Sequence, residues 1–72
     1  MASMHSARYR RFLEKLREFR QKAGLTQVAV SEALGRPQSY VSKCESGERR
    51  VDILDLEEFA KLYKREVGDF LP

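Results

Sequence analysis

Apolar side chains recur at helical spacing over most of the chain. Between Arg8 and Ala23 they follow the i, i+3, i+4, i+7 rule of an amphipathic helix with one buried face. These positions are Tyr9, Phe12, Leu13, Leu16, Phe19 and Ala23. Gly24 ends this first helix, because glycine readily adopts the left-handed conformation that often follows a helix. Residues 1–7 show no such period, so we expect a disordered tail ahead of one domain over 8–72.

Two short helices follow in quick succession. Thr26 is a candidate N-cap for a second helix over 27–34, which Gly35 ends. Pro37 starts a third helix over 37–46, because the fixed φ of proline suits a first helical turn. The third helix turns apolar side chains inward at Tyr40, Val41 and Cys44. It turns polar side chains outward at Gln38, Ser39, Ser42 and Lys43.

The last third of the chain predicts two more helices. Asp52 caps the fourth helix, and Asp55 three residues later favours the positive helix start. Its expected buried stripe is Ile53, Leu56, Phe59, Ala60 and Tyr63. Residues 66–71 form a short fifth helix that Pro72 stops. No segment alternates with period two, so the expected fold is all-α.

Length and composition exclude several classes of protein. A chain of 72 residues has room for one small domain and not for a two-domain enzyme. There is no long apolar run and no signal-peptide pattern, so we expect a cytoplasmic protein without a membrane span. One cysteine and one histidine cannot make an internal disulfide or complete a four-ligand zinc site. No catalytic constellation and no phosphate-cradling glycine loop is visible, so we expect no enzyme, no cofactor and no small-molecule ligand.

Charge is distributed unevenly along the chain. Residues 1–50 carry 11 basic and 5 acidic side chains, whereas residues 51–72 carry 3 basic and 6 acidic ones. The pattern suits a basic front that meets a polyanion, but it fits a solvated helical surface about as well.

Two short helices joined at a glycine are the sequence form of a helix-turn-helix. Here the run is LTQVAVSEALGRPQSYVSKCESGERR. It resembles the XRE family of phage-repressor and Cro-like DNA-binding domains, whose pattern has Leu-Thr-Gln, a glycine at the turn and Gln-Ser-x-Val-Ser-Lys-x-Glu-x-Gly. The resemblance covers residues 12–71. It implies a compact five-helix bundle of the lambda-repressor type, in which the third helix enters the major groove of double-stranded DNA.

The resemblance also implies roles for individual residues. Gln38, Ser39 and Lys43 would contact bases, and amide, hydroxyl and ammonium groups are suited to base edges. The expected phosphate contacts are Gln27, Arg36, Tyr40, Ser42, Arg49 and Arg50. Arg49 and Arg50 are flanked by Glu48 and Asp52, which would neutralise them if they paired. Without the resemblance, polar residues on a helix face would simply be solvated.

Other positions of the motif have structural reasons. Ser31 is small where the second and third helices cross closely, and Gly35 supplies the positive φ of the tight turn. The family pairs an arginine of the first helix with a glutamate of the third, here Arg20 and Glu45. The chain departs from the family at Val28 and Ala29, which remove the capping box, and at Pro37, which replaces a Ser or Thr cap. Residues 63–65, Tyr-Lys-Arg, replace the family's Leu-Gly-Val.

The sequence is consistent with three functions to different degrees. The first is a sequence-specific regulator, a repressor that binds a palindromic operator as a homodimer. Its expected interface, unless the core needs the same side chains, is Leu54, Leu62, Val67, Phe70 and Leu71. The second is an antitoxin or protein-binding adaptor on the same scaffold, and the third, an enzyme, has almost no support in the sequence. The operator, the regulated gene and the sign of regulation are not encoded in these patterns.

Overall fold

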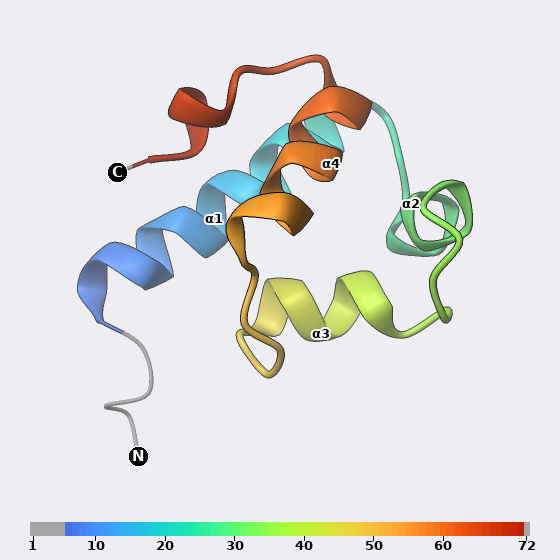
Figure 1. Ribbon diagram of the computed structural model, residues 1–72, viewed down its shortest axis with the longest axis horizontal. Coiled ribbons are helices and arrows are strands. Elements are labelled where there is room, and N and C mark those ends of the chain that lie inside the picture. The colour runs from blue at the N-terminus through green and yellow to red at the C-terminus, as the bar shows by residue number, and fades with distance from the viewer. Residues whose placement is uncertain (1–5, 72) are drawn as a thin grey trace.

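The computed structural model describes residues 6–71, which form four α-helices and one short 3₁₀ helix (Figure 1). In chain order the elements are α1 (Ala7–Lys22), α2 (Gln27–Ala33), α3 (Tyr40–Ser46), α4 (Ile53–Tyr63) and η2 (Val67–Phe70). α3 packs against both α1 and α2, and η2 packs against α1 and α4. Figure 1 shows α3 along one edge of the molecule, beneath α1 and α4 in that view. The described residues contain no strand, in keeping with the all-α expectation.

The core is built from the predicted helical stripes together with a set of aromatic rings. Side chains with no solvent exposure come from every helix: Leu16, Val30, Val41, Cys44, Phe59 and Phe70. The ring of Phe59 stacks between those of Tyr40 and Tyr63, with centroid distances of 6.0 and 5.9 Å. Cys44 is fully buried in this core, and burial raises the pKa of its thiol. It therefore packs as a small apolar side chain.

The first helix begins slightly earlier than predicted. Ser6 is its N-cap, since the Ser6 Oγ accepts a hydrogen bond of 3.1 Å from the Tyr9 backbone N–H. Ser6 and Ala7 therefore belong to the start of α1, which the sequence placed at Arg8. The remainder of the expected tail, residues 1–5, lies outside the described residues.

The third helix begins at Tyr40, three residues after the predicted start at Pro37. Pro37, Gln38 and Ser39 form a turn, closed by a 2.9 Å hydrogen bond from the Tyr40 N–H to the Pro37 carbonyl. The side chain of Ser39 does not cap the helix. Instead, Ser31 of α2 accepts a 3.2 Å hydrogen bond from the Val41 N–H and donates one of 3.4 Å to the Gln38 carbonyl. A side chain from outside the segment thus fixes where α3 starts.

The predicted fifth helix is a 3₁₀ helix of four residues, so the bundle has four α-helices among the described residues. Hydrogen bonds of the i to i+3 type hold it, from Asp69 N–H to Glu66 C=O and from Leu71 N–H to Gly68 C=O. The segment is too short to wind further, and its one fully buried side chain, Phe70, meets Phe19 edge to face at 4.9 Å.

None of the helices in residues 6–71 has the length and apolar character needed to cross a bilayer.

Candidate nucleic-acid interface

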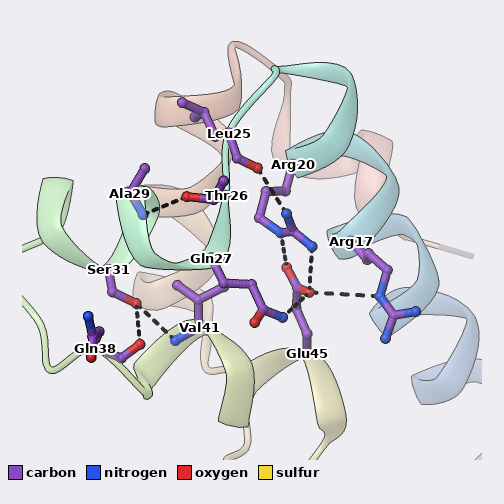
Figure 2. Close-up of polar contacts among 10 residues, drawn as sticks. All are labelled: Arg17, Arg20, Leu25, Thr26, Gln27, Ala29, Ser31, Gln38, Val41 and Glu45. Atoms are coloured by element: carbon purple, nitrogen blue, oxygen red, sulfur yellow. Dashed lines mark hydrogen bonds and ion pairs between the residues drawn. The ribbon is translucent and has the colours of Figure 1, made fainter.

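Glu45 of α3 joins three helices through one buried carboxylate (Figure 2). Arg20 of α1 donates two hydrogen bonds to it, from Nε to Oε2 at 2.6 Å and from Nη2 to Oε1 at 3.1 Å. Gln27 of α2 donates a third, of 2.9 Å, to Oε1. The Nε of Arg17 lies 3.8 Å from the same oxygen. The carboxylate therefore sets the position of α3 relative to α1 and α2.

The charged groups of Glu45 and Arg20 are buried and have hydrogen-bond partners within the protein. The side chain of Glu45 is 1% exposed, and that of Arg20 is 11% exposed. The Nη1 of Arg20 also donates a 2.9 Å hydrogen bond to the Leu25 carbonyl, where the chain leaves α1. Hydrogen bonding to Glu45 raises the pKa of Arg20, which stays charged. The sequence analysis predicted the pairing of Glu45 with Arg20, but it did not predict the contact of Glu45 with Gln27.

The junction of α2 and α3 has the geometry of a helix-turn-helix. Gly35 adopts a φ of +66°, which lets the chain reverse directly after α2. Ser31 is fully buried, and its hydroxyl bonds the backbone at the start of α3. A larger side chain at Ser31 would both lose these bonds and separate the two helices.

The predicted base-contacting residues lie together on the outer side of this junction. Gln38, Ser39 and Lys43 are all exposed, the first two in the turn and Lys43 on α3. Ser39 and Lys43 line one shallow hollow together with Arg36 and Arg49. We use the name reading surface for the four polar residues that line this hollow together with the exposed Gln38 and Ser42 of the same segment: Arg36, Gln38, Ser39, Ser42, Lys43 and Arg49.

Tyr40 does not fit the phosphate contact expected of it. The residue is 6% exposed, and its hydroxyl is buried without a hydrogen-bond partner among the described residues. Burial raises the pKa of Tyr40 to about 12. Tyr40 instead supports the surface from below, since the guanidinium carbons of Arg36 and Arg49 lie 4.8 and 5.1 Å from its ring centroid.

The other side chains expected to contact phosphates already have partners within the protein, at different distances. The half-buried Gln27 already donates to Glu45. Arg36 pairs with Glu58 at 2.9 Å. Arg49 lies 3.8 Å from Asp55, and Arg50 lies over the ring of Tyr9 at 4.6 Å. The carboxylate nearest Arg49 is thus Asp55 and not the flanking Glu48 or Asp52. The sequence assigned Asp55 only a favourable interaction with the positive start of the fourth helix.

Comparison with known proteins agrees with this geometry. Residues 11–69 match the family model described as a helix-turn-helix domain. A solved structure of an XRE-family like protein from Pseudomonas syringae pv. tomato superposes with a TM-score of 0.80 at 41% sequence identity, covering 89% of this chain and 80% of that one. The chain is an XRE-type helix-turn-helix domain. No curated protein matches it significantly.

Membership of this family makes the XRE-type domain a DNA-binding regulator, a class that typically performs no catalysis. The five residues of the expected apolar interface differ in exposure and fall into three kinds. Phe70 is fully buried under Phe19 and is not available to a partner, which corrects its assignment. Leu62 and Val67 are half-buried against the core. Leu54 and Leu71 are exposed.

Ile53 was predicted to lie in the buried stripe of α4 and is instead 61% exposed. It is the first residue of the helix, where the side chain projects past the end of the core. Ile53 and Leu71 line one shallow hollow with Tyr9 and Phe12 of α1. Together with Leu54 they form an exposed apolar group, which we call the apolar patch: Ile53, Leu54 and Leu71.

Proposed function

We propose that this XRE-type domain is a transcriptional repressor that binds a palindromic operator as a homodimer. The observation that carries the proposal is the reading surface. Gln38, Ser39 and Lys43 are presented outward while Ser31 and Glu45 hold the segment rigidly from behind. Such a surface matches the major groove, which admits an α-helix and offers each base pair as a distinct set of donors and acceptors.

The proposed base contacts follow from side-chain chemistry. Gln38 has an amide that pairs with the N6 and N7 edge of adenine, and Lys43 donates to O6 and N7 of guanine. Ser39 is both donor and acceptor, so it adapts to either base. The surrounding cations, Arg36 and Arg49, supply contacts to the backbone that set register without reading sequence. Repression then follows from occupancy, because the bound protein excludes polymerase without any chemical step.

The proposed homodimer provides a second recognition helix, which reads the second half of the operator. One recognition helix reads only a few base pairs, and two of them about 34 Å apart read a palindrome with useful specificity. The apolar patch supports this proposal because its three large apolar side chains are more than half exposed, and two of them, Ile53 and Leu71, line one hollow. The hollow is also lined by Arg8, Arg50 and Asp52, so it offers charges of both signs for pairing between two copies.

In vitro selection from a random duplex pool tests the function directly. We expect a palindromic consensus, with the logarithm of the binding constant falling with the logarithm of salt by about 0.9 per phosphate contacted. Lys43→Ala should relax the preference at one base position of each half-site, while Lys61→Ala on the exposed side of α4 should leave the consensus unchanged. A pool that yields no enriched sequence would count against a sequence-specific regulator and favour the adaptor function.

A further inference from the structure

Asp55 occupies an unusual position between two arginines of the reading surface. It lies in the first turn of α4, is 8% exposed and accepts a 3.3 Å hydrogen bond from the Asp52 N–H. Its Oδ1 is 3.8 Å from the Nη1 of Arg36, which precedes α3. Its Oδ2 is 3.8 Å from the Nη2 of Arg49, which follows α3. One buried carboxylate thus faces both ends of the recognition helix.

The ring of Tyr40 restrains the same two arginines from a second direction. Both guanidinium groups lie within about 5 Å of the ring centroid, at 4.8 and 5.1 Å. Tyr40 is itself fixed by the parallel ring of Phe59 at 6.0 Å. Asp55 and the ring therefore restrain both guanidinium groups, and Arg36 is also held by Glu58 at 2.9 Å. These contacts limit the directions in which the remaining N–H groups can point.

The restrained arginines border a hollow that also contains Lys43 and Ser39. Three cations around one hollow favour an anion. Arg49 faces Asp55 through Nη2 and can still donate from its other nitrogens, whereas Arg36 has both Nη atoms beside carboxylates and keeps its Nε. The anion that meets a helix-turn-helix surface at this place is a phosphate of the DNA backbone.

We propose that Asp55 is a positioning residue, which aims Arg36 and Arg49 so that together with Lys43 they hold one DNA phosphate beside the bases being read. This inference rests on the proposed DNA binding and adds to it an acidic residue that improves affinity for a polyanion. Coulomb's law alone gives the opposite effect, because a carboxylate near the site lowers the local positive potential. The sign of the effect on binding therefore separates the two possibilities.

The test compares Asp55→Asn with Asp52→Asn in the full chain. Both changes remove one negative charge from the start of α4, and asparagine keeps an oxygen that accepts the capping hydrogen bond. Asp52 forms the other half of the capping box, so its variant is a matched control for charge and helix capping. The probe is one fixed 30-base-pair duplex of arbitrary sequence, because a phosphate contact does not depend on the bases.

We expect Asp55→Asn to bind this duplex about five- to tenfold more weakly than wild type at about 0.1 M salt. Its salt dependence should become shallower by about 0.9, the increment for one phosphate. Asp52→Asn should keep the wild-type slope and bind equally or more tightly. Arg49→Gln, a change at an exposed side chain, should lose the same slope increment, and adding Asp55→Asn to it should remove no more.

Several results would overturn the proposal. One is an Asp55→Asn protein that binds as tightly as the Asp52→Asn control. Another is weaker binding with an unchanged slope and a lower melting temperature, which would assign Asp55 to folding alone. Wild-type protein whose weak binding does not respond to salt would overturn the proposed function as well, so the two failures are distinguishable.

Discussion

Glu45 accepts hydrogen bonds from Arg20 and Gln27 while it is almost completely buried, so the orientation of α3 depends on one carboxylate. A buried ion pair of this kind contributes little net stability compared with apolar packing, but removal of one partner strands the other charge. The expected penalty for breaking the pair is therefore much larger than its net contribution.

Glu45→Gln is expected to destabilise the fold by about 3 kcal/mol, because it leaves the guanidinium of Arg20 without a counter-charge. The measurement is thermal unfolding followed by circular dichroism. Weaker DNA binding should appear only as a consequence of unfolding, and it should recover when the comparison is made well below the melting temperature. Glu48→Gln on the exposed loop serves as the control, and a Glu45→Gln melting curve that matches wild type would remove this interpretation.

Because Tyr40 is buried, we expect the free energy of unfolding to fall at alkaline pH. Burial raises its pKa from 10 to about 12 in the folded protein, so the unfolded chain releases the phenolic proton first. The stabilisation is fully present below pH 10 and is lost as pH rises from about 10 to 12. Tyr40→Phe should lose about 2 to 3 kcal/mol less over this range than wild type, as urea unfolding at each pH would measure. Parallel declines in the two proteins would contradict the prediction.

At the level of residues, the sequence predicted the side chains that belong to the helix-turn-helix motif. Ser31, Val41 and Cys44 were placed inward by periodicity and are fully buried. The contacts of Asp55 with two arginines were not predictable, because Arg36, Arg49 and Asp55 come from separate segments whose approach depends on the packing of α4. Periodicity and motif spacing do not predict contacts between side chains of separate segments.

The helices α1, α2 and α4 were predictable because each combines buried apolar positions at helical spacing with a side-chain cap. Asp52 and Asp55 form the expected capping box of α4, with hydrogen bonds of 2.9 and 3.3 Å. The α2 helix lacks such a box, yet the Thr26 Oγ1 still accepts a 3.0 Å hydrogen bond from the Ala29 N–H. The start of α3 was misplaced, since its position depends on Ser31, a residue outside the helix.

The end of α4 shows the effect of one departure from the family pattern. Lys64 stands where the family has glycine, and it adopts a left-handed conformation with φ of +60°. This conformation costs a residue with a Cβ about 1 to 2 kcal/mol. The helix C-terminus thus retains the geometry of the family while carrying strain that glycine would not.

Lys64→Gly is expected to stabilise the protein by about 0.5 to 1 kcal/mol, because relief of the left-handed strain exceeds the entropy that glycine adds to the unfolded chain. Urea unfolding would measure the change. Gly35→Ala is the complementary variant: its φ is +66°, and an added Cβ would meet no atom within 4 Å, so any destabilisation reflects backbone strain alone. A Lys64→Gly protein that is less stable than wild type would contradict this account.

At the level of the whole molecule, the surface proposed to read DNA and the patch proposed for dimerisation occupy different regions. The reading surface surrounds α3, whereas the apolar patch lies where the start of α4 meets the C-terminal segment. Sequence periodicity could not separate Phe70 from Leu71, because they are adjacent apolar residues at the end of a four-residue 3₁₀ helix. Only the packing of Phe70 against Phe19 shows which of the two is buried.

The proposed homodimer predicts the effect of a charge in the apolar patch. Leu54→Glu should raise the dimer dissociation constant at least about tenfold, since the two-fold axis brings both copies of the new carboxylate into one interface. Sedimentation equilibrium would measure the shift. Val28→Glu, at another exposed apolar position, should leave the oligomeric state unchanged. A wild-type protein that is monomeric at high concentration would favour an interface with a different protein at this patch.

The way in which α3 is held has a consequence for variation in this protein. Ser31, Glu45 and the aromatic stack fix the backbone from the inside, while Gln38, Ser39 and Lys43 make none of those fixing side-chain contacts. The side chains proposed to contact bases are thus different from those that hold α3 in the fold. If the proposed base contacts hold, substitutions at these three exposed positions change the preferred DNA sequence without destabilising the fold.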